Sequence, residues 1–134
     1  MIGLRKFMEM SKEELNNYFI TSGFYENIPK ILPRNEIQVL DCREILGISC
    51  CSWKYKRERI QKKAFIYGIT GIGYCYTPGT NWGVTLIILR HLDMNEYVAA
   101  GYIEIDTVSQ TVKSIRDGLG KEVDSLSQYT DAFN

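Results

Sequence analysis

Residues Ala64–Asp106 read AFIYGITGIGYCYTPGTNWGVTLIILRHLDMNEYVAAGYIEID. Three apolar runs, Ala64–Tyr76, Trp82–Leu92 and Tyr97–Asp106, are separated by two short clusters of turn residues, PGTN and DMNE. Short apolar runs separated by Gly, Pro, Asn and Asp are typical of an antiparallel meander. We therefore predict three consecutive strands in one sheet, and the glycines of the first run favour strong curvature.

Alternation within these runs predicts which residues share a face. The second run is apolar on both sides, which is typical of an interior strand. Its two faces are Trp82, Val84, Leu86 and Ile88 on one side, and Thr85, Ile87 and Leu89 on the other. In the third run, Ile103 and Ile105 face one way, and Tyr102, Glu104 and Asp106 face the other.

Helical signals flank the meander at both ends. Ser11–Glu14 has the pattern of a capping box, and Gly23 supplies a stop, so we predict an amphipathic helix over residues 12–22. Phe24–Pro33 contains two X-Pro steps and is interpreted as an ordered apolar linker. A second capping box at Ser125–Gln128 predicts a short final helix.

Between these ends, Thr111–Ile115 alternates as a further strand, and Asp117–Gly120 is predicted to be a flexible turn. Residues 48–63 fit either a half-buried strand or a helical stripe. With 134 residues, the chain is long enough for one domain, residues 1–134. The predicted fold class is α+β. It is a curved antiparallel sheet of about five to six strands, flanked by an N-terminal helix and a short C-terminal helix.

Composition excludes several classes of protein. The formal net charge is zero, which argues against a general nucleic-acid binder, because such proteins normally carry a basic excess. The four cysteines form no C-x-x-C pair, and His91 is the single histidine, so we expect no metal site and reduced thiols. No secretory leader and no membrane-spanning run is evident, so the predicted location is cytoplasmic.

No catalytic or cofactor-binding pattern is present, and we predict that the chain is not an enzyme. His91 precedes a turn, and no signature of a cysteine nucleophile surrounds any thiol. Gly71–Gly73 lacks the lysine and the following helix of a phosphate-binding loop. Glu104 and Asp106 share a strand face, but solvation explains two carboxylates at a strand end better than catalysis does.

One basic cluster lies between Lys54 and Lys63, beside two aromatic residues. A solvated hairpin tip or a lysine-protected edge strand explains such a cluster. The alternative is a contact with a nucleic acid or with an acidic protein. Aromatic residues interleaved with Arg and Lys suit base stacking and phosphate contacts, and Trp, Tyr and Arg dominate the hot spots of protein interfaces. The candidate partner-binding residues are Trp53, Tyr55, Lys56, Arg57, Arg59 and Lys62.

The order of elements and the last third of the chain resemble the SUKH superfamily of bacterial toxin-immunity proteins. The resemblance depends on Tyr102–Asp106, on Thr111–Ile115, and on the serine-capped Val123–Tyr129. The asparagine and serine that often open the final helix of that family are replaced by Val123 and Asp124, and the family's N-terminal Gly and Trp signals are not evident. The resemblance implies an α+β domain that neutralises a cognate toxin by protein–protein contact, as in contact-dependent inhibition.

Two alternatives stay open at this point. The first is a small-ligand module or enzyme with an apolar pocket between helix and sheet. That pocket would be lined by Tyr67, Tyr74, Tyr76, Trp82 and Tyr102. The second is a homodimer joined through the outer face of the meander, since zero net charge gives little repulsion between copies.

Overall fold

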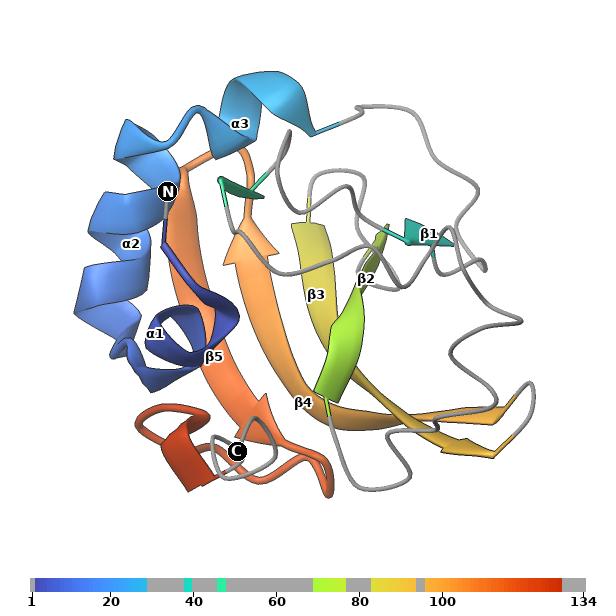
Figure 1. The fold of residues 1–134 in the computed structure, drawn as a ribbon. Coiled ribbons are helices and arrows are strands. Elements are labelled where there is room, and N and C mark those ends of the chain that lie inside the picture. The colour runs from blue at the N-terminus through green and yellow to red at the C-terminus, as the bar shows by residue number, and fades with distance from the viewer. Residues whose placement is uncertain are drawn as a thin grey trace.

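The computed structural model describes residues 2–28, 38–39, 46–47, 69–76, 83–93 and 96–128. In these residues three helices precede the main strands of an antiparallel sheet (Figure 1). The helices are α1 Leu4–Glu9, α2 Lys12–Thr21 and α3 Phe24–Asn27. The strands are β1 Gln38–Val39, β2 Ile69–Tyr76, β3 Gly83–Asp93, β4 Glu96–Asp106 and β5 Thr111–Asp117. The predicted α+β class is confirmed.

The sheet follows the chain, with the order β1-β2-β3-β4-β5 and antiparallel pairing throughout. The predicted meander is therefore confirmed for the described parts of its three runs. Leu86 of β3 lies between Tyr74 of β2 and Ile103 of β4, which sets the register. Irregular pairing near Ile88 and Ala99 accompanies the bend of β3 and β4 in Figure 1.

The core lies between the three helices and one face of the sheet, which we call the inner face. Alternation along β3 and β4 places apolar residues there, and every one of them is nearly inaccessible to solvent. The inner-face residues are Ile72, Tyr74, Val84, Leu86, Ile88, Ile103, Ile105, Val112 and Ile115. Phe7, Phe19 and Phe24, one from each helix, are fully buried against this layer and touch ring to ring.

Helix α2 begins at Lys12, as predicted, and ends at Thr21, one residue before the predicted end. Ser11 Oγ accepts the N–H of Glu14 at 3.2 Å, and Glu14 Oε1 accepts the N–H of Ser11 at 3.1 Å, which completes the capping box. Gly23 has a φ of +80°, the left-handed conformation that glycine adopts without steric cost, and it ends the helical path after Ser22.

Two helices were not predicted. Helix α1 has six residues, too few to be stable alone, and it is held by the burial of Leu4, Phe7 and Met8. Helix α3 occupies the start of the predicted linker and has four residues. Its apolar residues Phe24 and Tyr25 are buried, as the linker interpretation required, but in a helical conformation.

Strand β5 is an edge strand whose exposed backbone groups are partly covered. Asn16 of α2 accepts the N–H of Val112 through Oδ1 at 2.6 Å. Further along, the chain returns beside the same edge, where the N–H of Val123 donates to Ile115 O at 2.9 Å. Covering an edge in this way removes a template for pairing with another strand.

The predicted C-terminal helix is described only at its beginning. Ser125 Oγ accepts the N–H of Ser127 at 3.3 Å. The predicted capping box requires the N–H of Gln128 instead, one residue further along the chain. Leu126 is buried, and its N–H donates to Met8 O at 3.0 Å, which joins this segment to α1. The remaining residues of the predicted helix lie outside the described residues.

Candidate binding surface

The predicted partner-binding residues all lie outside the described residues. They are Trp53, Tyr55, Lys56, Arg57, Arg59 and Lys62, and the ambiguous segment 48–63 lies outside as well. His91 is placed on β3 as backbone only. Within the described part of the chain, no group of three or more His, Cys, Asp or Glu side chains could hold a metal ion.

The second face of the sheet, which we call the outer face, is more polar than the inner face. Two cross-strand rows run over it from β3 through β4 to β5. The rows are Thr85, Glu104 and Ser114, and Ile87, Tyr102 and Arg116. Thr85, Ile87 and Ser114 are buried, whereas the others keep part of their side chains in solvent.

Glu104 is the centre of the polar contacts on the outer face. Its Oε1 accepts hydrogen bonds from Ser114 Oγ at 2.5 Å and from Arg116 Nε at 2.8 Å. The serine hydroxyl first, and the guanidinium second, lower the pKa of Glu104 below its ordinary 4.5. The Glu104 side chain keeps 31% of its surface in solvent, and its cross-strand neighbours bind it as well.

Asp106 has a separate role in the turn that joins β4 to β5. Its Oδ1 accepts the N–H groups of Val108 at 2.9 Å and Ser109 at 3.0 Å. These backbone hydrogen bonds lower the pKa of Asp106, the one from Ser109 most strongly. Glu104 and Asp106 therefore have different hydrogen-bond partners.

The turn after β5 is held by several hydrogen bonds, although the sequence predicted a flexible turn. Asp117 Oδ1 accepts the N–H groups of Leu119 and Lys121, both at 2.9 Å, and Asp117 O accepts the N–H of Gly120 at 3.0 Å. Arg116 Nη1 donates to Gly120 O at 3.0 Å. The Leu119 side chain at the tip is 97% exposed.

A hollow of about 460 Å³ lies on the outer face next to this turn. Its walls are the middle of β3, β4 and β5 and the turn itself. The lining residues are Thr85, Ile87, Tyr102, Glu104, Arg116, Gly118, Leu119 and Gly120. Gly118 is a required glycine, because a Cβ there would come within 2.9 Å of Ala99 O.

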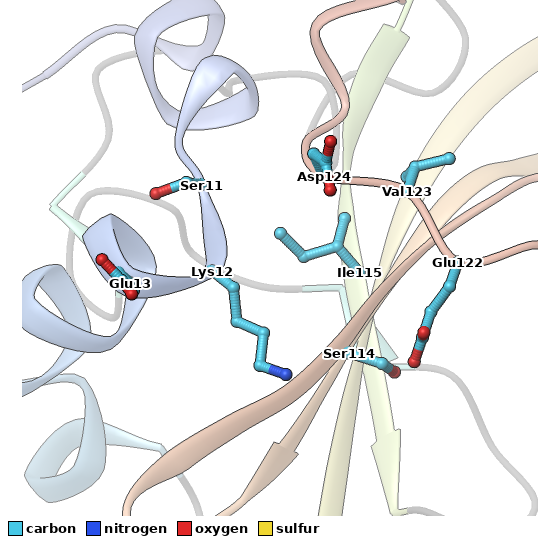
Figure 2. Close-up of a pocket in the computed structure, with 8 residues that line it drawn as sticks. All are labelled: Ser11, Lys12, Glu13, Ser114, Ile115, Glu122, Val123 and Asp124. Carbon is cyan, nitrogen blue, oxygen red and sulfur yellow. The ribbon is translucent and has the colours of Figure 1, made fainter.

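Figure 2 shows a second hollow, of about 450 Å³, between the start of α2 and the edge of β5. Lys12 and Glu122 extend into it from the two sides, and Ser114 lies on β5 between them. Ser11, another lining residue, is already engaged in the capping box of α2. One cation and several carboxylates line this hollow. Among its described lining residues, no buried polar side chain is left without a hydrogen-bond partner that a ligand could satisfy.

The predicted aromatic pocket does not form from the residues that the structure describes. Tyr74 is buried on the inner face, whereas Tyr102 lines the outer hollow, so the two rings lie on opposite faces of the sheet. Tyr67 and Trp82 lie outside the described residues, and Tyr76 is described as backbone only.

No protein-family model, curated protein or solved structure matches this chain. Among the described residues, no helix is long and apolar enough to cross a membrane.

Replacement of Glu104 by glutamine is expected to alter the pH dependence of stability. A carboxylate with a depressed pKa in the folded state stabilises the fold above its unfolded-state pKa, and this stabilisation is lost as the pH falls through the folded-state pKa. We expect Glu104→Gln to lower the free energy of unfolding at neutral pH by about 1 kcal/mol or less, because the ion pair is partly exposed.

Urea unfolding at a series of pH values would measure this effect. The difference between the wild type and Glu104→Gln should be constant above the ordinary pKa of 4.5 and should shrink below it. Glu9→Gln, at an exposed position on α1, is the matched control. A difference that stays constant into acid would contradict the assigned hydrogen bonds.

Proposed function

We propose that this chain is an immunity-type protein that binds and neutralises a cognate bacterial toxin domain by protein–protein contact. It would act in the cytoplasm as one α+β domain with a curved sheet of about five to six strands. In this proposal the chain uses no cofactor and carries out no chemistry, and its partner is the toxin rather than a nucleic acid or a membrane. The resemblance to the SUKH superfamily gives the class of partner.

One observation carries the proposal. The space between the helices and the inner face is filled by side chains that are almost fully buried, including Phe7, Phe19 and Leu86. The two hollows described above lie elsewhere, on the outer face and at the start of α2. A filled core with polar and apolar groups on its surface favours a binding protein, because enzymes and ligand carriers usually enclose a pocket.

The basic cluster is the proposed toxin contact. Trp53, Tyr55, Arg57 and Arg59 are of the residue types that contribute most to interfaces. If they bind an acidic surface around the active site of a toxin, the positive charges would also speed association.

Co-purification with the product of the neighbouring upstream gene would test this function. We expect a stable complex, and we expect the double variant Arg57→Glu/Arg59→Glu to weaken it by about 100-fold. Lys6→Glu/Lys12→Glu is the matched control, since it reverses the same charge at two exposed positions of α1 and α2. Failure of the wild-type protein to bind that product would contradict the proposal.

A small-ligand module is the second candidate, and the outer hollow of about 460 Å³ favours it. This volume lies within the usual range for ligand pockets, and Tyr102 supplies an aromatic wall. A screen of small aromatic compounds by thermal unfolding would separate the two functions. Stabilisation of the wild type that is lost in Tyr102→Ala would support the ligand module.

A further inference from the structure

The segment Glu122–Leu126, which we call the strap, runs beside the edge of β5 and on to α1. Its two ends are joined to different elements by backbone hydrogen bonds. The N–H of Val123 donates to Ile115 O of β5 at 2.9 Å, and the N–H of Leu126 donates to Met8 O of α1 at 3.0 Å. The strap therefore links the edge of the sheet to the first helix.

One side chain fastens the strap. Of its five residues, all of which the structure describes, Leu126 is the one that is fully buried, and Val123 is partly buried against the same core. Leu126 packs over Gly101 of β4, where a Cβ would come within 2.7 Å of Leu126 Cδ2. The glycine thus provides the room that the leucine fills. Because burial of a leucine removes much apolar surface from water, Leu126 is the latch of the strap.

The rest of the strap is loosely held. Glu122 and Asp124 are exposed, and a hollow of about 450 Å³ lies between the strap and the start of α2 (Figure 2). Glu122 approaches Arg116 at 3.8 Å, but its side chain is 67% exposed, so this ion pair contributes little. Segments with few buried apolar contacts are those that open locally while the rest of a protein stays folded.

The turn before the strap has its own hydrogen bonds, which do not depend on the strap. Asp117 Oδ1 accepts the N–H of Lys121 at 2.9 Å, and Arg116 Nη1 donates to Gly120 O at 3.0 Å. These contacts can persist when the strap leaves the edge. The turn therefore gives the strap a fixed point from which to open.

We propose that the strap is a conformational device, in which Glu122–Leu126 detaches as one unit from β5 and α1 while the sheet stays folded. Detachment frees Ile115 O and removes the chain that runs beside this part of the β5 edge. A strand edge with free backbone groups can pair with another strand, so the strap decides whether this part of the edge is open. This device is independent of the proposed binding of a toxin.

Amide hydrogen exchange followed by NMR would test whether the strap opens by itself. After correction for intrinsic rates, we expect the N–H groups of Val123 and Leu126 to exchange at rates within about 10-fold of each other. Both should exchange at least about 100-fold faster than the global stability from urea unfolding allows. Slower exchange, or rates that differ by more, would overturn the proposal.

Two substitutions separate opening of the strap from unfolding of the whole chain. Leu126→Ala should speed exchange at Val123 by at least about 30-fold, because the latch is lost. Leu119→Ala is the matched control, since that side chain is 97% exposed in the preceding turn, and it should leave this exchange unchanged. Ile105→Val, at a buried position of β4, should lower the global stability but leave exchange at Val123 within about 2-fold of the wild type.

A larger acceleration at Val123 in Ile105→Val would overturn the proposal, because the strap would then open only when the sheet unfolds. An effect of Leu126→Ala no greater than that of Leu119→Ala would also overturn it. The conservative Ile105→Val variant keeps the test decisive if Leu126→Ala does not fold.

Discussion

Replacement of Phe19 by alanine is expected to lower the free energy of unfolding by about 3–5 kcal/mol. Phe19 is fully buried, and its ring lies 4.6 Å from that of Phe24 and 5.9 Å from that of Phe7, measured between centroids. The substitution leaves a cavity where all three helices meet, and it also removes the ring–ring interactions. Urea unfolding followed by circular dichroism would measure the loss.

Ile20→Ala is the matched control for this prediction. Ile20 is the next residue of α2, but its side chain is 53% exposed, so we expect a loss of about 0.5 kcal/mol or less. A loss below about 1 kcal/mol for Phe19→Ala would mean that the helices are not packed as described, since burial of a phenylalanine contributes more than that.

Gly101→Ala is expected to destabilise the fold by about 2 kcal/mol, which is typical of overpacking. A Cβ at this position of β4 would lie 2.7 Å from Leu126 Cδ2 and 3.1 Å from Arg116 O. The leucine cannot move away easily, because it is buried and its N–H is bonded to Met8 O. The glycine therefore lets the C-terminal segment close over the sheet.

The same substitution at Gly3 serves as the control, because a Cβ there meets nothing within 4 Å. The source of the strain can be tested by a double-mutant cycle. In a Leu126→Ala background, Gly101→Ala should cost at least about 1 kcal/mol less than in the wild type. An unchanged cost would show that the strain comes from the backbone of β5 instead.

The parts of the fold that were predicted correctly depend on short-range patterns. The capping box at Ser11 and the stop at Gly23 each involve a few neighbouring residues, so they can be recognised without tertiary information. The alternation of Val84, Leu86 and Ile88 likewise follows directly from strand geometry.

The helices that were missed depend on tertiary contacts. Helix α1 is shorter than any length that is stable alone, and the burial of Leu4, Phe7 and Met8 holds it in place. Helix α3 begins immediately after Gly23 and ends at Asn27, two residues before Pro29. Glycine and proline this close together indicated a linker.

One feature of the outer face could have been predicted from the sequence, and another could not. The register of the β4–β5 hairpin places Ser114 directly opposite Glu104, and Arg116 lies on the diagonal, so the ion pair could have been predicted from an aligned hairpin. The exposure of Leu119 has no periodic signal, because it results from hydrogen bonds within a single turn.

We propose that this chain acts on a toxin by occupying a surface and not by chemistry. Titrating a fixed amount of the cognate toxin with the purified chain, and measuring residual toxin activity over time, tests it most directly. We expect activity to fall in proportion to the chain added, to end at a fixed molar ratio, and not to change further with time. Progressive inactivation of a large excess of toxin by a small amount of the chain would contradict the account.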